Sequence, residues 1–213
     1  MFSEPVTRRR ALLAAAAGIA AAPFVASPAH AAVPLIYLDP GHGGSDPGAV
    51  GNGLREKDIT LDIGLRTRSI LTSSWNVAVR MSRTTDVYRS LSYRSSDANA
   101  WGAHLFVSIH VNAGGGTGFE SYIYPGASSR THRLQDDVHA AVLANMRTIS
   151  SITDRGQKTA NFHVLRETAM SAVLTENLFI DRTYDANLLS RSDFRQATAR
   201  GHARGIARFL GLI

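Results

Sequence analysis

Apolar and polar positions alternate in a way that predicts strands and helices in turn along most of the chain. An apolar run at residues 35–38 stops abruptly at residues 39–41 (Asp-Pro-Gly), which is typical of a buried strand that ends in a tight loop. A second apolar run, residues 106–113, has the same design and carries His110 near its end. His42 follows the first run in the same way, and loops after the strands of a parallel sheet are where functional residues gather.

The rest of the chain continues this alternation of element types. Helical spacing of apolar residues begins just after Glu56, Ser90 is expected to N-cap a helix that ends near Trp101, and a short helix is expected to close at residues 187–190. Two longer amphipathic helices are predicted at residues 129–148 and 197–210. Further strands are predicted at residues 75–81, 119–124, 162–165 and 172–176, and a turn at residues 154–156. This order predicts one α/β domain without internal repeats.

Residues 1–31 have the pattern of a targeting segment. A twin-arginine pair within residues 8–10 precedes an apolar run through Val25, and residues 29–31 (Ala-His-Ala) form a cleavage signal. The alternative is a retained membrane anchor, but the apolar stretch is short, rich in alanine and broken at Pro23. We therefore expect export by the twin-arginine pathway, a mature domain of residues 32–213, and no membrane span after cleavage.

Composition narrows the chemistry. The chain of 213 residues has no cysteine, which excludes disulfides, thiolate zinc sites and a cysteine nucleophile. The formal charge is +6, and without the three arginines and one glutamate of residues 1–31 it is about +4. No dense block of Lys and Arg with interleaved aromatic residues is present, so we expect no nucleic-acid partner and only a mild attraction to an anionic cell envelope. A monomer is expected.

Two histidines and two glutamates form the candidate site. His42, His110 and Glu56 are the ligand types of a catalytic zinc ion, which uses three protein ligands and lowers the pKa of a bound water to about 7. Glu176, at the end of an apolar strand, is the candidate general base and acid. Taken alone, Glu56 is also explained as an acidic residue in the first turn of a helix, where the dipole favours it.

Several weaker candidates surround this set. Asp39 is a candidate for orienting a ligand histidine, and the backbone N–H groups of Gly43 and Gly44 for holding a developing oxyanion. His163 either lines the cleft or, more simply, is structural. His104 shares strand parity with His110 but lies about 20 Å away along the strand. His132 and His139, seven residues apart on one helix, are expected on the surface, and His202 is expected in the terminal helix.

Other catalytic motifs are missing. The glycines of residues 114–118 lack the Gly-Lys-Ser/Thr of a phosphate loop, and there is neither a G-x-S-x-G elbow nor a His-Glu-x-x-His helix. A carboxylate pair for glycoside cleavage remains open from spacing alone, although the two histidines would then have no role.

These segments together resemble a known family, the zinc-dependent N-acetylmuramoyl-L-alanine amidases of the amidase-3 type. The resemblance covers residues 34–211 and rests on five stretches: residues 38–44 (LDPGHGG), 55–58 (REKD), 82–86 (SRTTD), 108–113 (SIHVNA) and 174–180 (LTENLFI). The first, second and fourth carry His42, Glu56 and His110 at the family's ligand positions. The last carries Glu176 at the position of its catalytic glutamate.

The resemblance implies a fold and a reaction. The implied fold is a six-stranded, mostly parallel sheet flanked by helices on both faces. The implied reaction is hydrolysis of the amide between the lactyl group of N-acetylmuramic acid and L-alanine in peptidoglycan, with one zinc ion, in the cell wall, outside the cell or in the periplasm. Two departures stand out. Asn177 and Leu178 replace the family's usual small residue and glycine, so the shape of the cleft floor is expected to differ. Residues 114–118 are too short to contain the autoinhibitory helix that some members insert after the His110 strand. A zinc peptidase acting within the stem peptide and a non-catalytic wall-binding module remain as alternatives.

Overall fold

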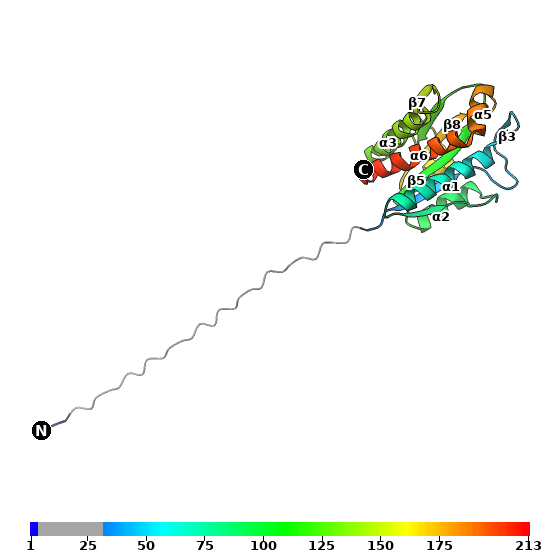
Figure 1. Ribbon diagram of the computed structural model, residues 1–213. Helices are drawn as coiled ribbons and strands as arrows, with labels where there is room; N and C mark the ends of the chain where they lie inside the picture. The colour runs from blue at the N-terminus through cyan, green and yellow to red at the C-terminus, as the bar shows by residue number, and fades with distance from the viewer. Residues whose placement is uncertain (4–31) are drawn as a thin grey trace. The chain divides into compact units, whose positions relative to one another are not determined.

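A six-stranded mixed sheet forms the centre of the fold (Figure 1). It is seen in a computed structural model that describes residues 1–3 and 32–213, so the predicted twin-arginine pair, apolar run and cleavage site lie outside the described residues. The strand order is β4-β1-β5-β8-β6-β7. All neighbours pair in parallel except β6 and β8, which are antiparallel. The strands are β1 (Leu35–Pro40), β4 (Ala78–Met81), β5 (Leu105–Asn112), β6 (Phe119–Ile123), β7 (Asp154–Thr159) and β8 (Ser171–Phe179).

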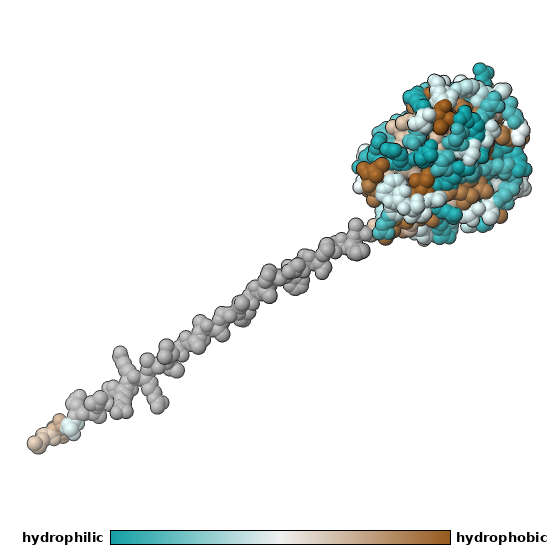
Figure 2. Space-filling model, in the orientation of Figure 1, coloured by the Kyte–Doolittle hydropathy of each residue, from teal (hydrophilic) through white to brown (hydrophobic). Residues whose placement is uncertain are grey.

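Helices cover both faces of this sheet. In the view of Figure 1, α1 (Glu56–Ser74), α3 (Ser129–Met146) and α6 (Ser192–Phe209) cross its near face. The outer surface of these three helices is largely polar, with scattered hydrophobic patches (Figure 2). The helices α2 (Leu91–Ala100) and α4 (His163–Arg166), the latter a single turn, pack on the other face. The helix α5 (Thr183–Ser190) precedes α6 in the chain. The strands β2 (Val50–Gly51) and β3 (Leu54–Arg55) form a small separate hairpin. The predicted α/β class and the sheet implied by the resemblance are therefore confirmed.

Each face of the sheet has its own hydrophobic core. The larger core lies under α1, α3 and α6, and the smaller one packs Tyr37, Phe106 and Leu174 against Ala98 of α2 and Leu165 of α4. Burial on both sides explains why the central strands are continuous apolar runs. Because α2 and α4 cover less of their face of the sheet, the ends of β5 and β8 are accessible there. The site described below lies in this opening.

Two glycines of α6 let this helix and α3 approach closely. A Cβ atom at Gly201 or Gly205 would lie 2.5 Å from the Cα of Val142 or Val138. Such a contact is too short for any side chain, so only glycine permits this packing. The helix begins at Ser192, five residues earlier than its apolar spacing predicted.

Helix starts were predicted better than short elements. Ser90 caps α2 by accepting a hydrogen bond from the N–H of Tyr93 at 3.1 Å, as expected. The strand predicted at residues 162–165 is wrong, because this segment forms α4. The turn predicted at residues 154–156 is also wrong, because these residues begin the edge strand β7. Among the described residues, no helix combines the length and apolar character needed to cross a bilayer.

Candidate metal centre

Three side chains that are far apart in the sequence meet above the carboxyl ends of β1 and β5. His42 lies in the loop after β1, Glu56 is the first residue of α1, and His110 lies near the end of β5. Nε2 of His42 is 3.2 Å from Oε2 of Glu56, and Nδ1 of His110 is 2.9 Å from Oε1 of the same carboxylate. One ligand atom from each residue lies within 4.8 Å of the other two. The structure therefore brings together all three predicted ligands.

The loops around this cluster are shaped to leave it room. A Cβ atom on Gly41 would lie 2.3 Å from Cε1 of His110, and one on Gly48 would lie 2.6 Å from Oε2 of Glu56. His42 itself has a φ of 61°, in the left-handed region that non-glycine residues seldom adopt. Strained backbone of this kind is concentrated at functional sites, where surrounding contacts hold it in place.

The donor set suits a zinc ion. Two imidazole nitrogens and one carboxylate oxygen are typical ligands of catalytic zinc, and a site with three protein ligands keeps a position free. Burial alone would raise the pKa of Glu56, but hydrogen bonds from His110 and His42 outweigh it and hold this pKa well below its usual value. The Glu56 carboxylate also accepts from the backbone N–H groups of Val111 and Ala49, at 3.0 and 2.9 Å. It is therefore ionised and fixed in position.

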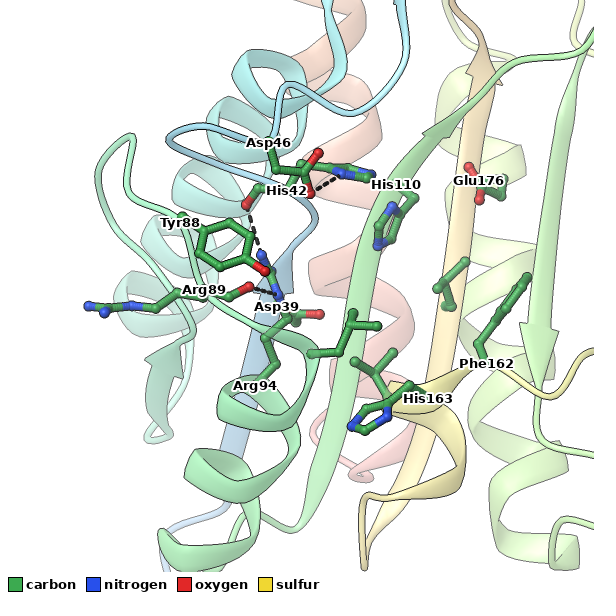
Figure 3. A pocket seen from close by; sticks show the side chains of 13 residues that line it. Asp39, His42, Asp46, Tyr88, Arg89, Arg94, His110, Phe162, His163 and Glu176 are labelled. Atoms are coloured by element: carbon green, nitrogen blue, oxygen red, sulfur yellow. Dashed lines mark hydrogen bonds and ion pairs between the residues drawn. The ribbon is translucent and has the colours of Figure 1, made fainter.

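Asp46 orients the first histidine, a role that the sequence analysis assigned to Asp39. Oδ2 of Asp46 lies 2.8 Å from Nδ1 of His42 (Figure 3). This contact leaves Nε2 of His42 directed at Glu56. A carboxylate on the far nitrogen of a ligand histidine fixes the tautomer and the direction of the ring. The spacing of four residues from His42 was the available sequence signal for Asp46.

Asp39 instead anchors the loop through a buried ion pair. It accepts from Nη1 of Arg94 at 2.6 Å and from Oγ of Ser108 at 2.8 Å. Burial would raise the pKa of Asp39, and the neighbouring Arg94 guanidinium more than reverses this, so the pKa lies below its usual value. Arg94 also donates to the backbone oxygens of Pro40 and His42, both at 2.8 Å. The pair thus ties α2 to the loop that carries the first histidine.

Removing this arginine is expected to destabilise the protein strongly. Arg94→Ala would leave the Asp39 carboxylate buried without its charge partner, which costs about 3–5 kcal/mol in free energy of unfolding. Urea denaturation measures this loss. The matched control is Arg80→Ala, which breaks the more exposed pair between Arg80 and Asp97 and should cost no more than about 1 kcal/mol. Equal losses in the two variants would contradict the anchoring role.

Glu176 lies beside the cluster on the next strand. In the pairing of β5 with β8 it is the direct partner of His110, and both face the open side of the sheet (Figure 3). Its Oε2 atom is buried and has no hydrogen-bond partner among the described residues. Burial raises the pKa of Glu176 to about 7; His110 opposes this shift, whereas Glu56 and Glu120 add to it. A carboxyl group with this pKa can accept and return a proton near neutral pH.

The raised pKa predicts how stability depends on pH. The folded-state pKa of about 7 lies above the ordinary value of 4.5, so the neutral carboxyl favours folding below pH 4.5 and this stability is lost as the pH rises through 7. In metal-free protein, Glu176→Gln removes the free-energy cost of holding an ionised carboxylate at this buried position. We expect it to gain about 1–3 kcal/mol over the unsubstituted chain at pH 8 and almost nothing at pH 4. Urea unfolding in chelator at several pH values measures this difference, and a gain independent of pH would contradict it.

A cavity of about 300 Å³ opens beside these residues. Its walls include His42, His110 and Glu176, with Tyr88 near His42 and Phe162 near Glu176 (Figure 3). The cavity is large enough for part of a sugar or peptide, and apolar walls with a few polar groups are usual for such sites. A substrate in it would lie directly against the candidate metal ligands.

Three weaker candidates have definite positions, and one histidine lies elsewhere than expected. His163 lines the cavity, with Nε2 3.4 Å from Oγ of Ser95. The N–H groups of Gly43 and Gly44 are already bonded, to the backbone oxygen of Asp46 and to Oδ1 of Asp86, so they are not free to hold an oxyanion. The surface position expected for His139 is wrong. It is buried between Ser121 and Asp154, at 2.8 and 3.0 Å.

The departure at residues 177 and 178 does not alter the cavity wall. Neither residue lines it. Asn177 is buried, and its Nδ2 supports the site by donating to the backbone oxygen of His110 at 2.9 Å. Leu178 takes a φ of 71°, where the resembling family often has glycine, but its side chain is fully buried in the larger core. Left-handed backbone costs about 1–2 kcal/mol, which burial of a leucine, about 1.5–3 kcal/mol, offsets.

Comparisons with known proteins agree with this geometry. A family model described as N-acetylmuramoyl-L-alanine amidase matches residues 36–208, so the chain belongs to that family. Over 178 residues the chain is 56% identical to the sporulation-specific N-acetylmuramoyl-L-alanine amidase of Bacillus subtilis, covering 83% of this chain and 68% of that protein. Over 181 residues it is 50% identical to the endolysin of Bacillus phage SPP1, covering 84% and 66%.

Solved structures show the same fold. The catalytic domain of CwlV, an N-acetylmuramoyl-L-alanine amidase from Bacillus (Paenibacillus) polymyxa var. colistinus, aligns with a TM-score of 0.79 at 32% identity, over 85% of this chain and all of that one. An N-acetylmuramoyl-L-alanine amidase from Clostridium difficile aligns with a TM-score of 0.80 at 30% identity, over 84% and 97%.

Proposed function

We propose that this chain is a secreted zinc amidase that hydrolyses the amide between the lactyl group of N-acetylmuramic acid and the L-alanine of the stem peptide in bacterial peptidoglycan. The observation that carries the proposal is the meeting of His42, Glu56 and His110 within 4.8 Å, beside the partly buried Glu176. Membership of the amidase family supports the choice of this bond over others.

Each residue has a distinct task in this reaction. His42, Glu56 and His110 would hold a zinc ion, and the chemistry that the ion would supply is polarisation of the scissile carbonyl and activation of a water molecule at neutral pH. Oε2 of Glu176 accepts the proton of the attacking water and passes it to the nitrogen of L-alanine as the amide breaks. Burial raises the pKa of Glu176, which suits a group that must act first as a base and then as an acid.

The surrounding residues hold the catalytic side chains in fixed positions. Asp46 fixes the ring of His42, and the pair of Asp39 with Arg94 fixes the loop on which that ring stands. Pre-organisation of this kind matters because a misplaced catalytic group loses most of its effect. The walls of Tyr88 and Phe162 exclude part of the surrounding water from the bound substrate.

The place of action follows from the amino-terminal segment. We propose export through the twin-arginine pathway, cleavage after Ala31 and action on the wall outside the cytoplasm as a monomer. The net positive charge of about +4 on residues 32–213 supports attraction to an anionic envelope.

Digestion of purified muropeptides tests the reaction. With zinc present, mass spectrometry should find free stem peptide and intact glycan, and chelation should stop their release. Shortened peptides still attached to sugar would instead indicate a peptidase acting within the stem. Absence of any cleavage product, with or without zinc, would indicate a binding module.

A further inference from the structure

Two cations stand beside the site and share one buried carboxylate. Nε of Arg155 and Nζ of Lys158, both on β7, donate to Oε2 of Glu120 on β6, at 2.7 and 2.5 Å. The Glu120 side chain is 3% exposed, whereas the side chains of both cations are 34% exposed. One negative charge thus holds two positive ones, and this Glu120 cluster (Glu120, Arg155 and Lys158) has a net charge of +1.

The Glu120 cluster faces the same opening as the catalytic candidates. In the antiparallel pairing of β6 with β8, Glu120 is the direct partner of Glu176, and directly paired residues project from the same face of a sheet. Oε1 of Glu120 also accepts from Nδ2 of Asn112, two residues beyond His110 on β5, at 2.7 Å. The two cations therefore flank the cleft on its β7 side.

The opposite side of the cleft has different chemistry. There the cavity is walled by Tyr88 and Leu91, whereas Phe162 lies on the β6 side, with its ring 5.3 Å from that of Tyr122. The guanidinium of Arg94 is neutralised by Asp39, and that of Arg89 points away from His110 and Glu176 in Figure 3. An exposed cationic pair therefore flanks the β7 side of the cleft, whereas the side of α2 presents mainly apolar groups.

This asymmetry matches the two sides of the scissile bond. The lactyl carboxyl group of the sugar is consumed in the amide, so the muramoyl side carries no charge there, whereas a stem peptide with acidic residues carries free carboxylates. Arg155 donates to Glu120 only through its Nε, and its terminal NH2 groups have no hydrogen-bond partner within residues 32–213. A guanidinium with free terminal donors is well suited to a carboxylate.

We propose that Arg155 and Lys158 form a subsite for a free carboxylate of the stem peptide, with Glu120 as the positioning residue that holds both cations toward the cleft. Two strand spacings place β7 about 10 Å from β8, the span of about three extended residues. The carboxylate recognised is therefore on the second or third residue of the stem. The subsite rests on the proposed amidase function and adds to it a preference among peptidoglycan chemotypes.

A pair of substrates tests the subsite. One is a muramoyl tripeptide with free side carboxylates, and the other is the same molecule with those groups converted to carboxamides. The unsubstituted zinc-loaded enzyme should prefer the free-acid substrate in kcat/KM. Arg155→Gln and Lys158→Gln keep a hydrogen-bond donor for Glu120, and each should reduce the preference by about tenfold, the effect of losing one charge-assisted hydrogen bond.

Controls separate recognition from folding and from the reaction itself. Arg155→Lys should keep most of the preference, and Arg204→Gln, on the exposed face of α6, should keep all of it. Equal cleavage of both substrates by the unsubstituted enzyme would overturn the subsite, as would variants that lower both rates by one factor. If the unsubstituted enzyme releases stem peptide from neither substrate, the proposed function fails and the subsite with it.

Discussion

Glu176→Gln is expected to lower kcat for muropeptide hydrolysis by about 10²- to 10⁴-fold while zinc content stays unchanged. Glutamine has nearly the same shape, but its amide cannot take the proton of the attacking water or return it to the leaving nitrogen. Because Glu176 is not among the three clustered ligand residues, metal binding should survive. Steady-state kinetics and elemental analysis of the same preparation measure both quantities.

The matched control for this variant is Glu167→Gln. Glu167 is exposed, forms its ion pair with Arg166 at the surface, and should keep full activity when neutralised. Near-normal turnover by the Glu176 variant would remove this residue from the mechanism, and loss of zinc from it would make Glu176 a ligand.

His110→Ala is expected to abolish metal binding. Of three protein ligands only His42 and Glu56 would remain, and Oε1 of Glu56 would lose one of its two partners, the one at 2.9 Å. Dialysed protein should therefore fall from about one zinc per chain to almost none, and activity should fall with it. Elemental analysis after dialysis provides the measurement.

His132→Ala is the control for the metal measurement. His132 is exposed on α3, outside the site, and its loss should leave the zinc content intact. Full zinc occupancy in the His110 variant would show that this residue is not a ligand. Equal loss in both variants would show that dialysis, rather than the substitution, had removed the ion.

The catalytic candidates were predictable because each has a strong local pattern. An apolar strand that ends at glycine-flanked His42, or that carries His110 near its end, is visible without any knowledge of the fold. Their meeting also follows from sequence, since the carboxyl ends of neighbouring parallel strands lie at one edge of a sheet. Glu56 and Glu176 were candidates from their positions at a helix start and a strand end, and the resemblance to the amidases supported both.

Residues whose role depends on distant partners were not predictable. Arg94 is 55 positions from Asp39, and Glu120 is 35 and 38 positions from Arg155 and Lys158. Nothing in the local sequence of Arg94 distinguishes it from a surface arginine. Such pairs become visible only after the sheet order places α2 beside β1 and β7 beside β6.

The predictions for short elements and for the edge strand were wrong for a different reason. Residues 162–165 (Phe-His-Val-Leu) form a short segment whose pattern fits a helix as well as a strand, and the packing of α4 over β8 favours the helix. The edge strand β7 is rich in charge and glycine, so its composition resembles a turn. His139 was placed on the surface because helical spacing alone does not reveal that its face of α3 packs against β6.

Anomalous diffraction at the zinc edge from crystals of the zinc-loaded protein would test the central claim most directly. One strong peak is predicted, about 2.0–2.2 Å from Nε2 of His42, a carboxylate oxygen of Glu56 and Nδ1 of His110, with the Glu176 carboxylate nearby but outside bonding distance. A peak elsewhere in the molecule, or one that lacks any of these three residues as a ligand, would contradict the account.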